Sequence, residues 1–422
     1  MSAVAADHLS PAVPKPAHVP DALVYDFDMF HDPAYVADPH KRVLDLVKNA
    51  PPVFWTPRSG GHWMLISHSA NFNAARDTDS FSSEFIPRAE LAAMKAKLPP
   101  GMPHIPLPIP INVDPPEHSK YRAPLQRVFS PKSMLAIKDS ITALATELID
   151  SVRDRGHCEF MKEIAEPMPV RVFLGLLGLP LDRQDEYRAL VSQHLSDPSP
   201  DPRAMIPKLQ RIAGSMRETF IERRDHPQDD IISLLWKIEI DGKPTTIEDM
   251  ENYGVLLFIA GLDTVMNGIG HGVRHLALHP ELQDQLRANP KLVQEATEEM
   301  LRRYTFTIPP RIVARDLVFE GVQMKARERA MLFLPGADLD PKEFPNSDAY
   351  DLNRDNKVHI AFNAGPHRCL GSHLARVELH VLYEVLMARL PRFRLDPRRP
   401  PTFHCGHVVG VDSLHLVWDV GH

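Results

Sequence analysis

One short segment near the C-terminus constrains the chain more than any other: FNAGPHRCLG, residues 362–371, holds a single cysteine between two glycines. Apolar residues recur at helical spacing in the stretch that follows, SHLARVELHVLYEVLMARL. Cys369 is therefore predicted to lie at a helix N-terminus, where unpaired N–H groups and the helix dipole lower the pKa of a thiol. Such a thiol suits a metal ligand or a nucleophile with His367 as its base. A small buried residue in a turn is the third interpretation.

Helical periodicity dominates the rest of the chain. It extends over residues 133–155 and over residues 279–304, where Pro290 divides the pattern in two. Strand-like runs are short and lie near residue 65, from Arg311 onward and near the C-terminus. The pattern predicts a mainly α protein, a helical body with small peripheral β-sheets.

The ends and loops of the chain carry further signals. Four prolines interrupt residues 1–20, which we expect to form a flexible arm. No sharp change of composition divides residues 21–422, which we expect to form a single domain. Residues 85–112 and a second stretch from Ser196 are rich in proline and are predicted to be loops, of the kind that often cover a binding site.

Charge and cysteine usage exclude several classes of function. A formal net charge of -7 over 422 residues argues against nucleic acid as a partner, since phosphate binding needs a basic face. The three cysteines are far apart and form no C-x-x-C pair, so neither a disulfide framework nor a zinc site is expected. We find no signal peptide or membrane anchor and no coiled-coil seam, and we therefore expect a cytoplasmic monomer.

The cysteine segment resembles a known motif. The pattern F-x-x-G-x-x-x-C-x-G, formed by Phe362, Gly365, Cys369 and Gly371, is similar to the haem-ligand loop of the cytochrome P450 monooxygenases. The resemblance implies that Cys369 binds the iron of haem b as a thiolate and favours cleavage of the O–O bond. The two glycines would let the backbone approach the flat cofactor and direct N–H donors to the sulfur.

Two further stretches resemble the parts of this family that hold the haem and its surroundings. In EEMLRR, Glu299 and Arg302 match the family's E-x-x-R pair, which would form a buried ion triad with Arg354 of DLNRD. The resemblance also implies four contacts to the haem propionates, from His118, Arg122, Arg311 and His367. The first two of these lie one helical turn apart in DPPEHSKYR.

The segment GVLLFIAGLDTVMNGIG resembles the long central helix of the same family. Ala260 and Gly261 match a pair of small residues that leaves space for dioxygen beside the haem. Asp263 and Thr264 match the acid and alcohol that follow. The resemblance implies that Thr264 holds dioxygen and an ordered water, while Asp263 relays protons from solvent.

Within the family, FIPR, GLDTV and RDLVFEGVQMK are most similar to the soluble bacterial camphor 5-monooxygenase group. That resemblance implies a helical triangular prism with minor sheets and electrons from a ferredoxin, itself reduced by an NAD(P)H-dependent reductase. The chain agrees, because it has no dinucleotide fingerprint after a strand and no room for a flavin domain. In the camphor enzyme two basic side chains hold the acid of the central helix. Arg188 matches one of them, but Ser196 stands in place of the other.

The substrate is expected to differ from camphor. The camphor enzyme offers a tyrosine hydroxyl to its substrate, and this chain has no tyrosine between Tyr35 and Tyr121. The predicted pocket walls are Phe85, Ile259, Thr307, His407 and Val408. The candidates for a polar contact are His104, Asn112 and His407. We expect a small apolar substrate such as a terpenoid, a norisoprenoid or an aromatic compound.

The expected reaction is insertion of one oxygen atom from dioxygen into a C–H bond of that substrate. Three alternatives remain open at this point: a haem peroxygenase that uses peroxide directly, a haem sensor without turnover, and a haem-free cysteine hydrolase. The acid and alcohol at Asp263 and Thr264 count against the first.

Overall fold

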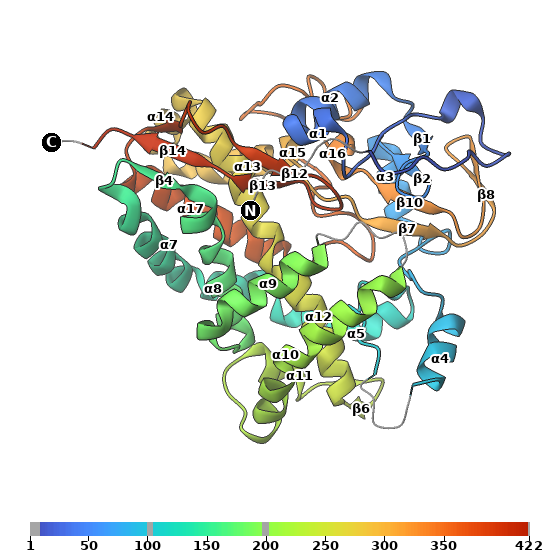
Figure 1. Ribbon diagram of the computed structural model, residues 1–422. Coiled ribbons are helices and arrows are strands. Elements are labelled where there is room, and N and C mark those ends of the chain that lie inside the picture. The colour runs from blue at the N-terminus through green and yellow to red at the C-terminus, as the bar shows by residue number, and fades with distance from the viewer. Residues whose placement is uncertain (1–8, 99–103, 196–201, 421–422) are drawn as a thin grey trace.

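The computed structural model describes residues 9–98, 104–195 and 202–420 of the chain. An almost continuous apolar helix runs through its middle (Figure 1). The helix consists of α12 (Ile247–Leu262) and α13 (Thr264–Leu278), which are interrupted at Asp263. It is long and apolar enough to cross a membrane, yet more than half of its most apolar stretch is buried inside the protein. We therefore regard it as the core helix of the helical body.

The other helices of the body pack around this one. They are α5 (Glu117–Val128), α6 (Pro131–Ala136), α7 (Lys138–Arg153), α8 (Pro167–Leu177), α9 (Gln184–Leu195), α10 (Ile206–Asp225), α11 (Ile231–Leu235), α14 (Pro280–Ala288), α15 (Val293–Arg303) and α17 (Ser372–Arg389). Helix α17 lies against α7 and α15, and α10 lies against α12. One apolar core joins these helices. Most of them turn buried Leu, Ile, Val, Met or Phe side chains towards their neighbours, and α9 contributes the buried Tyr187.

A five-stranded sheet lies beside the helical body. Its order is β1 (Val53–Thr56), β2 (His62–Leu65), β10 (Arg329–Leu332), β7 (Pro310–Val313) and β3 (Phe81–Ser82). Strands β2 and β10 are parallel, and the other neighbours are antiparallel. Along the chain, the helices that precede, connect or follow the strands of this sheet are α1 (Pro33–Ala37), α2 (Pro39–Asn49), α3 (His68–Arg76), α4 (Arg88–Ala96) and α16 (Leu334–Ala337).

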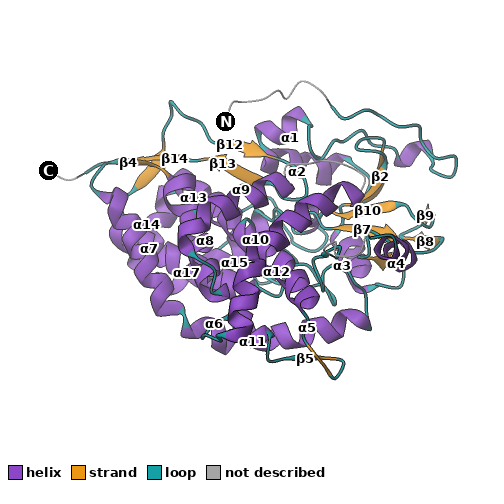
Figure 2. Ribbon diagram, turned by 60° about the horizontal axis from the view of Figure 1, so that its bottom comes forward, coloured by secondary structure: helices purple, strands orange, loops and turns teal. Residues whose placement is uncertain are grey.

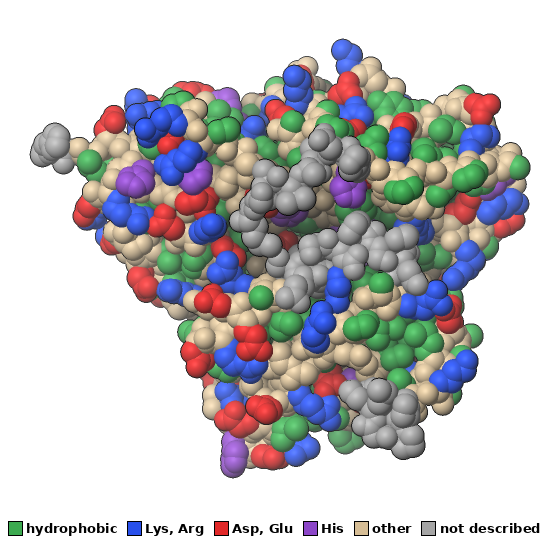
Figure 3. Space-filling model, viewed as in Figure 1, with side chains coloured by type: hydrophobic (Ala, Val, Ile, Leu, Met, Phe, Trp, Pro, Cys, Tyr) green, Lys and Arg blue, Asp and Glu red, His purple; other side chains and the backbone are tan. Residues whose placement is uncertain are grey.

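The remaining strands form small sheets at the margins of the helical body (Figure 2). They are β4 (His157–Glu159), β5 (Glu239–Ile240), β6 (Lys243–Pro244), β8 (Leu317–Phe319), β9 (Val322–Met324), β11 (Phe393–Leu395), β12 (Thr402–His404), β13 (Gly410–Ser413) and β14 (His415–Trp418). Hairpin β12–β13 matters for function, because β13 packs on α13. On the face drawn in Figure 3, basic and acidic side chains are interspersed, with no broad basic patch.

The structure corrects the expectation of a flexible arm over residues 1–20. Residues 9–20 pack against the sheet: Val13 donates its N–H to the Pro57 carbonyl at 3.0 Å, and the side chain of Val19 is buried. Proline favours an extended backbone, and an extended segment can lie along a sheet edge. Residues 1–8 lie outside the described residues.

Two helix boundaries also differ from the sequence pattern. The single helix expected over residues 133–155 is divided at Ile137 into α6 and α7. Inside the predicted loop of residues 85–112, the segment RAELAAMKA forms α4, because alanine, leucine, glutamate and lysine favour a helix. The second predicted loop falls largely on residues 196–201, outside the described part of the chain.

Candidate functional site

The cysteine loop is held from both of its ends. Cys369 donates its backbone N–H to the Phe362 carbonyl at 2.8 Å, which closes the loop. Gly365 has a φ of +67°, and a Cβ there would lie 2.4 Å from the carbonyl oxygen of Ala75 in α3. Only glycine fits this close approach. At Gly371 a Cβ would meet no protein atom within 4 Å, so the space beside that residue is open to a ligand.

The pKa of the Cys369 thiol differs from the value that the sequence predicts. Helix α17 begins at Ser372, three residues after the cysteine, so Cys369 precedes the first turn of the helix. Burial raises the pKa of Cys369, and the Gly371 N–H and Arg122 only partly oppose this effect. The expected low pKa is therefore wrong. A bound metal cation deprotonates a thiol outright, so a raised pKa does not exclude ligation.

An opening faces the middle of the central helix. Residues 250–258 of α12 are buried, Ile259 is half-buried and Ala260 is exposed. Protein closely surrounds Cys369, yet its side chain also keeps accessible surface. Gly261 does not contribute to this opening, because a Cβ there would lie 2.5 Å from the ring of Phe173 in α8. Its small size serves helix packing, which corrects the prediction that both small residues leave space for dioxygen.

The acid and alcohol lie at the interruption of the central helix. The Thr264 hydroxyl donates to the Ala260 carbonyl at 2.9 Å. The side-chain amide of Asn267 donates to Oδ2 of Asp263 at 3.1 Å. Burial raises the pKa of the Asp263 carboxyl, and the nearby His404 opposes this increase. A carboxyl in this setting can hold a proton closer to neutral pH than a free aspartate does.

Arg188 does not hold this acid. It forms ion pairs with Glu166 and Asp185 instead. Ser196, which the resemblance aligns with the second basic residue, lies outside the described residues.

Three of the four residues predicted to contact the propionates have buried nitrogen atoms without a hydrogen-bond partner. Arg311 is 3% exposed, and its Nε and Nη2 atoms are buried without a partner. The Nε2 atoms of His118 and His367 are also buried and unpaired, and the two rings lie 4.5 Å apart. His367 lies 3.6 Å from Asp114, beyond hydrogen-bonding distance. A buried guanidinium without a counter-ion is costly, and the two imidazoles can each donate an N–H, so this cradle fits a carboxylate such as a haem propionate.

Arg122 lies between the cradle and the cysteine. It donates to the Arg368 carbonyl of the cysteine loop, and burial lowers the pKa of Arg122 while Cys369 opposes that effect. The residue therefore places positive charge close to the sulfur.

The structure brings the predicted ion triad together. Glu299 and Arg302 are fully buried and joined by two hydrogen bonds of 2.9 and 2.8 Å. Arg354 donates to both carboxylate oxygens of Glu299 at 3.1 and 3.2 Å. Arg302 also donates to the carbonyls of Asp338 and Ser347. The triad thereby fastens the irregular segment that leads from α16 to the cysteine loop.

The predicted substrate residues come from several elements. Thr307 and Val408 face each other in an isolated antiparallel bridge, and Ile259 is half-buried on α12. Phe85 is half-buried between β3 and α4. His407 is exposed at the bridge, and its Nδ1 lies 3.2 Å from the Ile308 carbonyl.

The other two candidates for a polar contact are buried. His104 is already engaged, because its Nδ1 pairs with Glu251 of α12 at 2.9 Å. The side-chain oxygen of Asn112 has no hydrogen-bond partner, which leaves it free to accept a bond from a substrate.

Sequence reasoning missed two groups of interacting residues. The first is the ion cluster in which both His104 and Arg217 bind Glu251. The second is the pair formed by His404 and Asp412 at 2.6 Å, next to Asp263. Neither group has a sequence signal, because its members meet only through tertiary packing.

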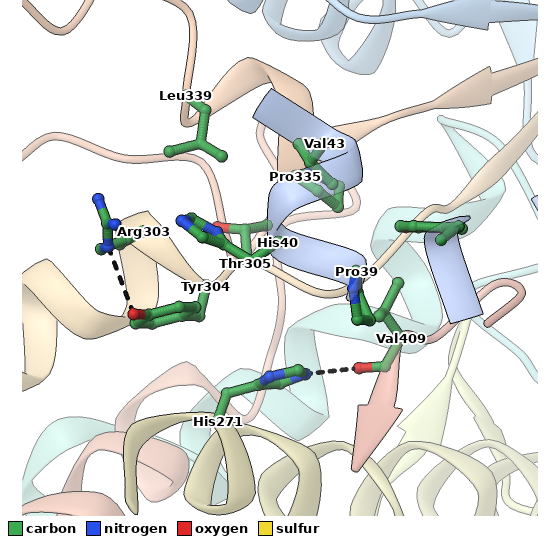
Figure 4. Close-up of a pocket in the computed structure, with 11 residues that line it drawn as sticks. Pro39, His40, Val43, His271, Arg303, Tyr304, Thr305, Pro335, Leu339 and Val409 are labelled. Atoms are coloured by element: carbon green, nitrogen blue, oxygen red, sulfur yellow. Dashed lines mark hydrogen bonds between the residues drawn. The ribbon is translucent and has the colours of Figure 1, made fainter. Parts of the chain in front are cut away.

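A small separate cavity lies under α2 (Figure 4). Its lining includes His40, His271, Arg303 and Tyr304, and none of the predicted site residues belongs to it. We therefore place the functional site at the cysteine loop and the interruption of the central helix.

Haem fits the donor set of this site. Within the described part of the chain, no group of three His, Cys, Asp or Glu side chains could hold a metal ion. An iron bound by Cys369 would thus need a macrocycle for its other ligands, and the cradle around Arg311 suits the propionates of that macrocycle.

Comparisons with known proteins agree with this geometry. A family model described as Cytochrome P450 matches residues 189–413, more than half of the chain. Probable cytochrome P450 127A1 of Sinorhizobium fredii is 34% identical over 96% of this chain and 97% of its own length. Linalool 8-monooxygenase of Pseudomonas putida is 28% identical over 90% of this chain and 95% of its own length. The crystal structure of CYP101J2 has a TM-score of 0.85 and 31% identity, covering 97% of this chain and 100% of that chain. The chain thus belongs to the cytochrome P450 family and is a monooxygenase that uses haem b.

Proposed function

We propose that this enzyme inserts one oxygen atom from dioxygen into a C–H bond of a small apolar substrate, with electrons from a ferredoxin. The observation that carries the proposal is the interruption of the central helix at Asp263 and Thr264, which begins three residues after the exposed Ala260. A peroxide-driven enzyme or a sensor has no need of an acid and an alcohol at that point. Haem b, when bound, supplies the iron at which dioxygen is activated.

Each residue of the site has a distinct task in this proposal. Cys369 binds the iron through its sulfur, while Arg311, His118 and His367 hold the propionates. The Thr264 hydroxyl donates to the Ala260 carbonyl, so its oxygen can accept a hydrogen bond from an ordered water. The Asp263 carboxyl holds a proton for delivery towards that water.

Replacement of the ligand tests the core of the proposal. Cys369→Ser should abolish the red-shifted absorbance band of the carbon-monoxide adduct, because that band requires a thiolate ligand. A serine variant that keeps the band would refute the assignment of Cys369.

Replacement of the alcohol tests the task of Thr264. We expect Thr264→Ala to consume dioxygen and NAD(P)H but to release hydrogen peroxide in place of product. Product and peroxide are measured together per NAD(P)H consumed, and full conversion to product in this variant would remove the role.

The substrate proposal is a small terpenoid, norisoprenoid or aromatic compound. It is supported by the apolar or half-buried residues Phe85, Ile259, Thr307 and Val408, and by the similarity to a linalool 8-monooxygenase. Asn112 is the polar contact that we favour, because its buried oxygen is unpaired. A screen of such compounds for the low-spin to high-spin absorbance change tests this class, and binding of large polar compounds alone would contradict it.

We also propose that residues 21–422 act as a single domain, a cytoplasmic monomer that receives electrons from a separate ferredoxin. Reconstitution with a ferredoxin, its reductase and NAD(P)H tests the electron source. Consumption of NAD(P)H without any product from the screened substrates would instead favour a sensor.

A further inference from the structure

A pair of polar residues on hairpin β12–β13 lies close to the acid of the central helix. The Nδ1 atom of His404 lies 2.6 Å from the carboxylate of Asp412. Both side chains are about half exposed, at 43% and 49%. The pair therefore reaches solvent, whereas the Asp263 carboxyl lies inside the protein.

Gly410 brings the imidazole of His404 next to the Asn267 amide. A Cβ at Gly410 would lie 2.4 Å from Nε2 of His404 and 2.6 Å from Oδ1 of Asn267. A side chain at position 410 would overlap both atoms, so only glycine lets them lie this close to the backbone of β13. Asn267 in turn donates from its Nδ2 to Oδ2 of Asp263, so the three side chains follow one another from the surface to the acid.

The hairpin is fixed to the central helix at this level. The Val411 N–H donates to Oδ1 of Asn267 at 3.2 Å. One turn further on, His271 donates from Nε2 to the Val409 carbonyl at 2.9 Å, as Figure 4 shows. These two bonds hold the β12–β13 hairpin in register with α13, so the position of His404 relative to Asp263 is set by the fold.

Other charged groups near Asp263 do not offer the same route. Glu166 lies at the start of α8, and its carboxylate is paired with Arg188. Asp412 contributes negative charge through the pair with His404. Among the groups named here that act on Asp263, His404 is the one basic side chain.

From this geometry we propose that His404, oriented by Asp412, delivers protons from solvent to Asp263. In the transfer step the Nε2–H bond of the imidazolium breaks and an O–H bond forms on the Asp263 carboxylate, through a bridging water. The imidazole then takes up a proton from solvent, and no atom is oxidised or reduced. The proposal rests on the monooxygenase function above, which consumes protons in every turnover.

The electrostatics agree with a transfer between these groups. The pKa of His404 is raised, because Asp412 and Asp263 outweigh the burial of the imidazole. The pKa of Asp263 is raised by its burial. The two groups act on each other, because Asp263 contributes to the raised pKa of His404 and His404 opposes the increase at Asp263. The supply of protons should decline as pH rises through the pKa of His404, above the ordinary histidine value.

The first experiment measures the coupling without turnover. The haem-bound protein in its ferrous carbon-monoxide form is diamagnetic, so the imidazole of His404 can be titrated by nuclear magnetic resonance. Asp263→Asn should lower the pKa of His404, with the resonances of His279 recorded in parallel. His279 is a matched reference, because it forms a similar half-exposed pair with Glu281 at 2.9 Å. An unchanged His404 titration in Asp263→Asn would overturn the proposal.

The second experiment measures turnover. His404→Gln should slow proton-dependent product formation about tenfold and increase the solvent isotope effect, whereas His279→Gln should behave as wild type. Asp412→Asn keeps the histidine and should move the alkaline limb of the pH profile to lower pH, so it tests the proposal if His404→Gln folds poorly. Equal rates and profiles in all variants would overturn it.

The failure of this proposal can be distinguished from the failure of the proposed function. Wild-type protein that shows the red-shifted carbon-monoxide band and forms product, with His404→Gln equally active, refutes only the relay. Wild-type protein without that band or without product refutes the monooxygenase function itself.

Discussion

Arg311 allows a prediction in which the sign of the effect depends on the cofactor. Burial lowers the pKa of this guanidinium to about 10, with only a weak opposing effect from Asp114. Arginine ordinarily has a pKa above 12, and one pKa unit corresponds to about 1.4 kcal/mol. Burial of this charge without an ion-pair partner therefore costs about 3 kcal/mol. A haem propionate would recover that energy as an ion pair.

We expect Arg311→Met to release haem to apomyoglobin about a hundredfold faster than wild type, because about 3 kcal/mol corresponds to two factors of ten. After removal of haem, the same variant should resist urea better than wild type, by up to about 3 kcal/mol, since the unpaired charge is gone. Haem release is followed by Soret absorbance and unfolding by circular dichroism.

The control is Arg329→Met on the neighbouring strand β10. Arg329 is also largely enclosed, but it donates to the carbonyls of Ser59 and Gly61 and not to the site. Its replacement should destabilise the protein with and without haem and leave the release rate unchanged. If Arg311→Met releases haem no faster than Arg329→Met, the propionate assignment is wrong.

Three shorter predictions concern the scaffold of the site. Glu299→Gln leaves two buried guanidinium groups without their carboxylate and should lower the free energy of unfolding in urea by about 3–5 kcal/mol. Glu295→Gln, on the exposed side of the same helix, should lower it by less than about 0.5 kcal/mol. Similar losses in the two variants would contradict the reasoning. Gly365→Ala should cost about 2 kcal/mol or more and reduce the share of protein with the red-shifted carbon-monoxide band, because its φ and the Ala75 carbonyl exclude a side chain. Burial raises the pKa of Glu378 to about 8, so the free energy of unfolding should fall as pH rises from about 4.5 to 8. Glu378→Gln should remove that fall. Parallel pH profiles of the free energy of unfolding in the variant and the wild type would refute this prediction.

Contiguous motifs were predictable from the sequence because their chemistry needs a fixed local spacing. Glu299 and Arg302 lie one helical turn apart, so their spacing in the sequence places both side chains on one face of a helix. The pairing of Arg354 with them followed only from the family resemblance, because 52 residues separate Arg354 from Arg302. The helical body and its small marginal sheets also followed from periodicity.

Features that depend on tertiary packing could not be predicted. His404 and Asp412 meet next to Asp263 only because β13 packs on α13, which no spacing in the sequence reveals. The ring of Phe173 gives Gly261 its reason to be small. The pKa of Cys369 was misjudged for a related reason: the position before a helix is local, but the burial that raises the pKa comes from the whole fold.

The packing of residues 9–25 against the sheet has a consequence for handling the protein. Strand β1 is the outermost strand of the five-stranded sheet. The Tyr25 N–H donates to the Trp55 carbonyl on its open side, and the Val13 N–H donates to the Pro57 carbonyl just beyond its end. An uncovered edge strand is a template for pairing between molecules. Deleting the chain as far as Tyr25 should therefore cause self-association and precipitation, even though the deletion removes none of the haem-binding or catalytic groups.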